Sequence, residues 1–429
     1  MMTGLGFRPY ETYKDSRVDW IGSIPSTWDV QRAKWLFKRM DRAVRPEDDI
    51  VTCFRDGEVT LRNNRRTEGF TTALKEIGYQ GIRKGDLVIH AMDAFAGAIG
   101  VSDSDGKSTP VYAACVPRLP NTVDPTFYAY YMRHLALSGF LMSLAKGIRE
   151  RSTDFRFNDF AELEVPFPPL AVQRSIVTFL DDKCAKIDEA VKVKEDQIAL
   201  LHERRQMIIQ DAVTRGLNPA TRMKESGIDW IGQIPAHWGV LPLFTLAKVK
   251  SIANRPDLEL LSVYLYRGVV PFADVEEKRT NTTSLDLSAY QVVDIGDLVL
   301  NNQQAWRGSV GVSAFRGIVS PAYIVLSLSQ DFDSDFANYY FRVGTTVANY
   351  LISSKGVGTI QRNLYWPKLK RALITIPPKS EQISIVKYIH ANTQKIDAGI
   401  AIKEREISAL KEYKTSLINA AVTGKIKVV

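Results

Sequence analysis

Three kinds of segment concentrate side chains that could recognise a nucleic acid. Arginine can form two hydrogen bonds with a guanine edge, asparagine and glutamine can do the same with adenine, and any lysine or arginine can neutralise a phosphate. The candidate contacts are Arg62, Asn63, Asn64, Arg65 and Arg66; Lys146, Arg149, Arg151 and Arg156; their later counterparts Lys355, Gln361, Arg362 and Asn363; and Asn302, Gln303, Gln304 and Arg307. The alternative for each segment is a solvated surface loop, since charged runs usually form such loops.

Patterns that would indicate catalysis are weak. The only metal-nuclease-like arrangement combines Asp257 with Glu276 and Lys278, where two carboxylates could bind Mg²⁺ beside a lysine. Residues 100–108 nearly form a phosphate-binding loop, but one residue too many separates the glycines and a β-like run follows. The three cysteines and five histidines are dispersed, so neither a disulfide framework nor a metal cluster is indicated. We therefore expect no catalytic residue, no metal site and no cofactor bound by this chain.

Length and composition indicate a multidomain globular protein. The chain has 429 residues, which suggests two to four domains, and 45% of them are hydrophobic, enough to build packed cores. The formal net charge of +8 is compatible with nucleic-acid binding without establishing it. No signal peptide and no apolar run of membrane-spanning length is present, so we expect a cytoplasmic protein.

The sequence contains an internal repeat, whose two copies are offset by about 210 residues. DWIGSIPSTW at residues 19–28 returns as DWIGQIPAHW at residues 229–238. Further matches include Gly85-Asp86-Leu87 with Gly296-Asp297-Leu298, and Pro168-Pro169 with Pro377-Pro378. This period is much longer than that of a solenoid repeat, so it indicates a duplicated domain.

Each half divides into a mixed α/β globule and a long helix. Short β-rich runs at residues 87–89, 111–116 and 323–326 predict strands. A helix is predicted over Thr126–Leu137 after Asp124-Pro125, with a counterpart over Asp333–Arg342. Residues 56–80 show little likeness to residues 267–291, so we expect the two globules to differ on their surfaces.

The second part of each half carries an apolar heptad pattern. Its a and d positions run from Val177 to Ala212 and, in the same register, from Val386 to Ala421, with basic residues at two matching steps. Two matched stripes of period 3.5 predict an antiparallel coiled coil, in which the basic residues set the register or extend outward. The alternative is that each helix merely covers its own globule. The predicted partner-binding positions are Gln173, Ile187, Leu201, Gln382, Ile396 and Leu410.

Four tryptophans recur within the repeated opening motif. Trp20 and Trp28 return as Trp230 and Trp238, with apolar neighbours each time. Stacking on bases is one interpretation. Their recurrence beside apolar residues favours the other, in which they form the framework that packs the start of each globule against a helix.

The doubled motifs resemble one known family. DWIG-x-IP at the start of each half, KGDLVIH or IGDLVLN in the middle, and P-P-x-x-x-Q opening a long helix that ends in Ala-Val-Thr are similar to the specificity subunits of type I restriction–modification systems. The likeness extends from Val18 to Thr423. It implies an α+β fold with two target-recognition domains separated by two long helices in an antiparallel coiled coil, with pseudo-two-fold symmetry. The expected segments are residues 1–168 and 216–377 for the domains, and 169–215 and 378–429 for the helices.

The same resemblance implies function and partners. Each domain would bind one half of a bipartite, asymmetric double-stranded DNA site, and the helices would fix the spacing and dock modification subunits, expected in two copies. S-adenosylmethionine would bind those partners, and ATP and Mg²⁺ a restriction subunit where one is present. Two alternatives stay open at this point: the nuclease that uses Asp257, Glu276 and Lys278, and a scaffold that binds only proteins.

Overall fold

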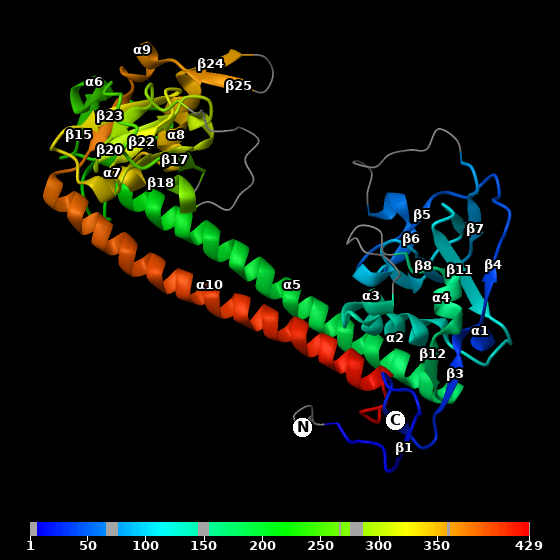
Figure 1. Ribbon diagram of the computed structural model, residues 1–429. Helices are drawn as coiled ribbons and strands as arrows, with labels where there is room; N and C mark the ends of the chain where they lie inside the picture. Colours follow the sequence, from blue (N-terminus) through cyan, green and yellow to red (C-terminus); the bar gives the residue numbers. More distant parts are fainter. Residues whose placement is uncertain are drawn as a thin grey trace. The chain divides into compact units, whose positions relative to one another are not determined.

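The structure is a computed structural model that describes residues 7–65, 76–144, 154–265, 267–274, 286–357 and 361–428. The chain forms two compact units (Figure 1). Unit 1 comprises Met1–Lys194 and Arg405–Val429, and unit 2 comprises Glu195–Glu404. Each unit therefore contains one globule and a portion of both long helices.

The globule of unit 1 is built on a four-stranded antiparallel sheet with small hairpins around it. The sheet has the order β4 (Phe37–Met40), β11 (Tyr112–Pro117), β8 (Leu87–His90), β9 (Ile99–Val101). Four further antiparallel pairs are β1 (Tyr13–Asp15) with β2 (Ser23–Pro25), β3 (Asp29–Arg32) with β12 (Glu164–Phe167), β5 (Val51–Cys53) with β6 (Val59–Leu61), and β7 (Gln80–Ile82) with β10 (Gly106–Ser108). The helices are α1 (Ala33–Leu36), α2 (Pro125–Leu137), α3 (Phe140–Leu144) and α4 (Phe157–Glu162), with 3-10 turns η1 (Arg62–Asn64) and η2 (Ala94–Ala96).

Helix α2 begins where the sequence predicts it. The Asp124 carboxylate accepts a hydrogen bond from the Thr126 backbone nitrogen at 2.9 Å, and Pro125 fills the first helical position. The aromatic side chains of α2, Phe127, Tyr128 and Tyr131, are almost fully buried in the core. The helix is thus fixed at its start by a cap and along its face by apolar burial.

Unit 2 repeats this order of elements. Its sheet has the order β16 (Ala247–Lys250), β23 (Tyr323–Leu328), β20 (Asp297–Asn301), β21 (Val310–Val312). The flanking pairs are β13 (Met223–Glu225) with β14 (Gln233–Pro235), β15 (Gly239–Pro242) with β26 (Leu373–Ile376), β17 (Leu261–Tyr264) with β18 (Gly268–Pro271), β19 (Gln291–Val293) with β22 (Gly317–Val319), and β24 (Ser354–Val357) with β25 (Gln361–Leu364). Its helices are α6 (Leu243–Leu246), α7 (Ser334–Tyr340), α8 (Gly344–Ile352) and α9 (Trp366–Leu369), with η3 (Phe272–Asp274) and η4 (Ala305–Arg307).

Two sequence expectations are refined by this repeat. The segments without sequence likeness hold equivalent elements: β6, η1 and β7 in unit 1, and β18, η3 and β19 in unit 2. The helix predicted over Asp333–Arg342 is shorter, because Asp333 is its cap and the chain turns before α8 begins at Gly344. Strand pairing therefore persists where the sequences have diverged.

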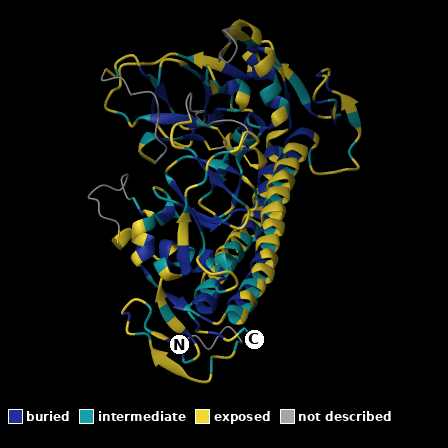
Figure 2. Ribbon diagram, turned by 90° about the vertical axis from the view of Figure 1, so that its right-hand side faces the viewer, coloured by how far each residue is buried: buried dark blue, intermediate teal, exposed yellow. Residues whose placement is uncertain are grey.

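Both long helices are continuous and follow the predicted heptad pattern. Helix α5 spans Leu170–Arg215 and helix α10 spans Lys379–Val422. Every a and d position from Val177 to Ala212 and from Val386 to Ala421 is buried or half-buried, while most other positions are exposed (Figure 2). Towards their globule-bound ends the helices also pack into the cores, as with Ile176 and Leu180, so both sequence interpretations hold along different stretches.

Ion pairs within each unit show that the helices run antiparallel. In unit 1, Lys414 contacts Asp188 at 2.7 Å, and Lys194 contacts Glu406 at 2.7 Å. In unit 2, Arg205 contacts Asp397 at 3.3 Å, the repeat-equivalent of the Lys414 pair. Three of the basic seam residues therefore reach a carboxylate on the facing helix, which favours one register over its neighbours.

The end of each long helix packs on the opening motif of a globule. Gly216 (φ +72°) after α5 lies against Pro235 and Trp238, and Gly424 (φ +71°) after α10 lies against Pro25 and Trp28. A glycine adopts this left-handed backbone at little cost, and a side chain at Gly424 would meet the Pro25 ring at 2.5 Å. The two helix ends therefore close their globules in the same way.

The chain ends meet within unit 1. The Tyr13 hydroxyl donates to the Gly424 carbonyl at 3.1 Å, and the Lys427 backbone nitrogen donates to the Arg8 carbonyl at 2.8 Å. This agrees with the antiparallel arrangement expected from the sequence.

The framework interpretation of the tryptophans is confirmed for one of each pair. Trp28 and Trp238 are 0% and 1% exposed, and the Trp238 indole donates to Glu381 at 3.1 Å. The interpretation does not extend to Trp20 and Trp230, which are exposed. These two lie in the turn that joins the strands of the first hairpin of each unit, and the Trp20 ring packs against Phe140 with ring centroids 5.3 Å apart.

Candidate nucleic-acid interface

In unit 2, two loops that the sequence singled out come together. The turn after β20 carries Asn302, Gln303, Gln304 and Arg307, and the hairpin of β24 and β25 carries Lys355, Arg362 and Asn363. A hydrogen bond of 3.0 Å from the Leu364 nitrogen to the Asn302 carbonyl joins them. Gln303, Arg307, Lys355, Arg362 and Asn363 are exposed, so the joined loops present polar and cationic groups to solvent.

Aromatic rings hold the cations of this surface. The Trp306 indole lies under the guanidiniums of Arg307, at 4.7 Å, and Arg362, at 5.7 Å. The Lys355 ammonium lies 3.9 Å from the centre of the Tyr365 ring. Trp306 is itself fixed, because its indole donates to the Gln303 carbonyl at 2.9 Å. Such contacts orient a cation without neutralising it.

Unit 1 joins the equivalent segments by the equivalent bond. The Phe155 nitrogen donates to the Ala91 carbonyl at 2.9 Å, which places Arg156 beside the turn after β8. In that turn the Asp93 nitrogen donates to His90 Nδ1 at 3.0 Å, and burial lowers the pKa of His90. The turn thus carries a neutral imidazole, where unit 2 carries amides.

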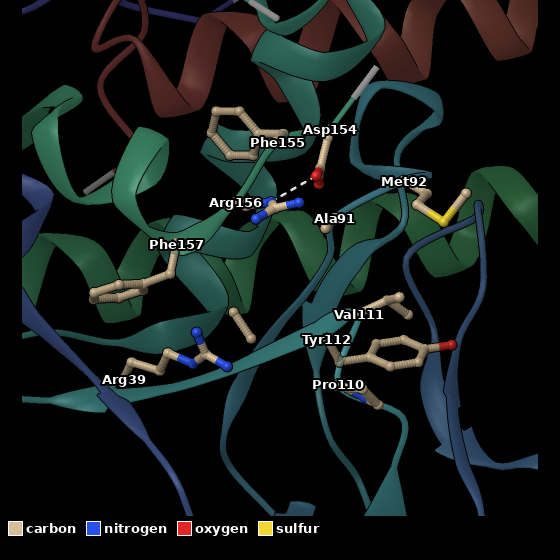
Figure 3. A pocket seen from close by; sticks show the side chains of 11 residues that line it. Arg39, Ala91, Met92, Pro110, Val111, Tyr112, Asp154, Phe155, Arg156 and Phe157 are labelled. Atoms are coloured by element: carbon tan, nitrogen blue, oxygen red, sulfur yellow. Dashed lines mark hydrogen bonds and ion pairs between the residues drawn. The ribbon is translucent and has the colours of Figure 1, made fainter. Parts of the chain in front are cut away.

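A pocket of about 400 Å³ opens at this junction in unit 1 (Figure 3). Arg39 of β4, Tyr112 of β11, Met92 and Arg156 line it, together with Phe157. The Arg156 guanidinium pairs with the Asp154 carboxylate at 2.6 Å. Two arginines, Arg39 and Arg156, therefore contribute to the lining of this pocket.

The first polar segment of unit 1 is partly tied to its own hairpin. Arg65 pairs with Asp56 at 2.6 Å and Glu58 at 2.9 Å and lies over the Phe54 ring. Asn64 donates to the Thr60 hydroxyl at 2.8 Å, while Asn63 is exposed beside it. Arg62 donates to the Thr52 hydroxyl at 3.3 Å.

A half-buried arginine contacts the loops in both units, and sequence reasoning missed it. Arg133 of α2 donates to the carbonyls of Arg55 and Gly97, which lie in the β5–β6 turn and after η2. Arg342, its counterpart, lies against Gly268 in the matching turn, and burial lowers the pKa of both arginines. A Cβ on Gly57 would meet the Arg133 guanidinium at 2.2 Å. The signal was present in the repeat, as Tyr-Tyr-Met-Arg and Tyr-Tyr-Phe-Arg.

Several predicted contacts fall outside the described residues. These are Arg66, Lys146, Arg149 and Arg151; Gln361 is described in its backbone only. Sequence reasoning also passed over Arg39, Tyr112 and Trp306. Trp306 stood between two predicted contacts, and Arg39 could be found only from the pairing of β4 with β11.

The predicted partner-binding residues lie within the chain's own packing. Gln173 is fully buried, donates to the Pro168 carbonyl and accepts from the Asp124 nitrogen, and Gln382 makes the same contacts with Pro377 and Asp333. Ile187 and Ile396 are buried in the helix seam, and Leu201 and Leu410 are half-buried. The glutamines therefore fasten α5 to the N-cap residue of α2 and α10 to the N-cap residue of α7. Docking of a partner at the six positions stays a prediction.

The nuclease alternative finds no support. Asp257 is engaged by Arg255 through two bonds of 2.8 and 2.7 Å, while Glu276 and Lys278 fall outside the described residues. In the part of the chain that the structure describes, no cluster of three metal-binding side chains occurs. The same described residues include no helix long and apolar enough to cross a membrane.

Comparison with known proteins places the whole chain in one group. No model of a known protein family matches it. The MjaX type I restriction enzyme specificity subunit of Methanocaldococcus jannaschii is 23% identical, with 100% of both chains covered. The MjaVIII specificity subunit of the same organism is 25% identical over 72% of each chain.

Solved structures agree on the fold. A chain from a study of complex assembly and conformational transition of the type I R-M system matches with a TM-score of 0.66 at 15% identity, covering 93% of this chain and 98% of the other. The HsdS subunit from Thermoanaerobacter tengcongensis matches with a TM-score of 0.51 at 17% identity, covering 94% and 98%. The chain is thus similar in sequence, over its full length, to type I restriction enzyme specificity subunits, and it shares its fold with solved chains of such systems.

Proposed function

We propose that this chain is the non-catalytic DNA-recognition subunit of a type I restriction–modification complex, in which each unit binds one half of a bipartite site. The observation that carries the proposal is the repeat of one fold with different loops at the same place. The turn after the third strand of the sheet reads His90-Ala91-Met92-Asp93 in unit 1 and Asn301-Asn302-Gln303-Gln304 in unit 2. Different donors and acceptors at equivalent positions favour different base sequences, and hence an asymmetric target.

The long helices supply the spacing in this proposal. A helix rises about 1.5 Å per residue, so an uninterrupted helix sets a length that a flexible linker cannot. The interhelical ion pairs and buried seam of each unit keep the pairing in register. The gap in the DNA site would follow from helix length, as half-site spacing does in dimeric repressors.

The outer faces of the helices support docking of the same partner twice. In unit 1 the exposed c positions of the heptad on α5 hold Lys186 and Val193, the latter 50% exposed. In unit 2 the matching positions on α10 hold Lys395 and Ile402, the latter 48% exposed. The repeat of an exposed apolar residue at equivalent positions of the two units, outside the seam, supports the proposal of one modification subunit per unit.

The partners supply the chemistry in this proposal. S-adenosylmethionine binds the modification subunits, while ATP and Mg²⁺ belong to a restriction subunit. Docking is tested by Val193→Glu and Ile402→Glu, with Lys192→Ala as an exposed control on α5. Each glutamate variant should retain one modification subunit instead of two in size-exclusion chromatography with light scattering, whereas unchanged assembly contradicts this docking face.

Methylome sequencing tests the function directly. Deletion of the gene from its host should remove methylation at one bipartite DNA motif, and restoring the gene should bring it back. An unchanged methylome contradicts the proposal. Binding of the assembled complex should also weaken steeply with salt, since cations on phosphates release counterions. A scaffold that binds only proteins would show no DNA binding even at low salt.

A further inference from the structure

The two arginines that contact the Trp306 indole differ in their electrostatic partners from Arg65 and Arg156, the candidate arginines of unit 1 that form ion pairs. Arg307 comes from η4 and Arg362 from β25, and both are exposed. Within the described part of the chain, neither forms an ion pair. In unit 1, by contrast, Arg65 and Arg156 each pair with carboxylates of their own unit.

Stacking on an indole leaves the hydrogen-bonding edge of a guanidinium free. The cation–π contact uses the flat face of the group, while its N–H donors point outward in the plane. The contact also restricts the side chain before any ligand arrives, which reduces the entropy lost on binding. An arginine held in this way suits a planar ligand with two adjacent acceptors better than a point charge.

The surroundings indicate a base edge as that ligand. The side chains beside the stack include two exposed amides, Gln303 and Asn363, together with the ammonium of Lys355, which pairs across the hairpin from Asn363. The Asn302 Oδ1 atom is buried, with no hydrogen-bond partner among the described residues. A surface built only to grip phosphates would need cations without this mixture of oriented amides.

We propose that the half-site bound by unit 2 contains a guanine, recognised through its O6 and N7 acceptors by an arginine of the Arg307–Trp306–Arg362 stack. Guanine presents two acceptors side by side in the major groove, which match the donor fork of arginine. Adenine places an N6 donor where O6 would be, so two donors would face each other. This inference rests on the proposed function and names the chemistry of one of its two sites.

Arginine-to-lysine variants test the assignment, because lysine keeps the charge and loses the fork. The full chain, assembled with its modification subunits, selects DNA from a randomised library as wild type, Arg307→Lys, Arg362→Lys and Arg371→Lys. Arg371 is an exposed arginine of unit 2 outside the stack and serves as the control. In one of the two stack variants, the preference for guanine at one position should fall about 10- to 100-fold. The half-site bound by unit 1, here called the other block of the site, should be unchanged.

A modified base gives an independent measurement. Replacing that guanine by 7-deazaguanine, which lacks the N7 acceptor, should weaken binding by wild type and have little effect on the affected lysine variant. If both stack variants selected the same DNA sequence as wild type, the proposal would be overturned. An equal loss of affinity for every sequence would also overturn it, because it would assign both arginines to phosphates. If wild type selected no sequence at all, the proposed function itself would fail instead.

Discussion

The two units present different electrostatics on one framework. In unit 1 the candidate cations Arg65 and Arg156 are paired with carboxylates, whereas in unit 2 Arg307 and Arg362 lie on an indole. In the proposed function, unit 1 would exchange internal ion pairs for contacts with DNA, while Arg307 and Arg362 of unit 2 have no ion pair to break among the described residues. Because an exposed ion pair contributes only about 0–1 kcal/mol, such an exchange in unit 1 would have a small cost.

The framework below these surfaces is the same in both units. A buried tryptophan meets a helix-ending glycine, and a half-buried arginine contacts turns next to the polar loops. The shared framework therefore tolerates different side chains in the loops it carries, so a duplicated module can change its exposed residues without losing its fold.

The largest expected effect comes from removing a framework tryptophan. Trp28→Ala and Trp238→Ala each leave a cavity in the core of one unit and should lower the free energy of unfolding by roughly 3–5 kcal/mol. Trp20→Ala is the matched control, because Trp20 is 42% exposed. Denaturant unfolding measures all three. Equal effects of Trp20→Ala and Trp28→Ala would contradict the division into buried and exposed motif tryptophans.

Removing one of the half-buried arginines should separate an effect on stability from an effect on DNA recognition. Arg133→Met leaves the carbonyls of Arg55 and Gly97 without their donor, which should cost about 1–3 kcal/mol. Because these carbonyls belong to turns of unit 1, DNA selection should degrade in one block only, and Arg342→Met should degrade the other. Loss of stability with both blocks intact would assign the arginines a purely structural role.

The pH dependence of stability should distinguish unit 1 from unit 2. Burial lowers the pKa of His90 and His134, and the nearby charge of Lys425 lowers that of His134 further. Since the folded pKa lies below the unfolded value near 6.5, these groups favour folding above that pH, and stability falls as pH decreases through it.

The slope cannot exceed about 1.4 kcal/mol per pH unit for each group. Unit 2 has Asn301 and Val343 at the equivalent positions, so unit 1 should lose stability first between pH 7 and 5.5. Hydrogen exchange measured at both pH values would show this. His90→Gln with His134→Gln should abolish the difference, and a persistent difference would require another titrating group.

The smallest expected effect is at the helix seam. Asp188→Ala in unit 1 and Asp397→Ala in unit 2 remove equivalent ion pairs with Lys414 and Arg205, each worth about 0.2–1 kcal/mol. The charge-reversed double variant Asp188→Lys with Lys414→Asp should recover most of the loss. Thermal unfolding at low and high salt measures it, and a loss insensitive to salt would point to packing instead of charge.

Sequence alone predicted the repeat, the helices and their register well, because heptads and paired Trp, Gly and Pro residues leave periodic signals. It located the polar loop after β20 but not the equivalent turn after β8. It could not show that a second segment joins each turn, since backbone hydrogen bonds between residues far apart in sequence connect Phe155 to Ala91 and Leu364 to Asn302. It likewise could not separate Trp20 from Trp28, because burial depends on tertiary packing. The pairing of Arg65 with carboxylates also depends on a hairpin fold that residue types do not specify.

A hybrid chain tests the central claim most directly, namely that each unit is an independent recognition module. Residues 222–378 are replaced by a second copy of residues 12–169, and the assembled hybrid selects DNA from a randomised library. The account predicts a site in which the block bound by unit 1 occurs twice and the block bound by unit 2 is absent. Selection of the original two different blocks by a folded hybrid would contradict it.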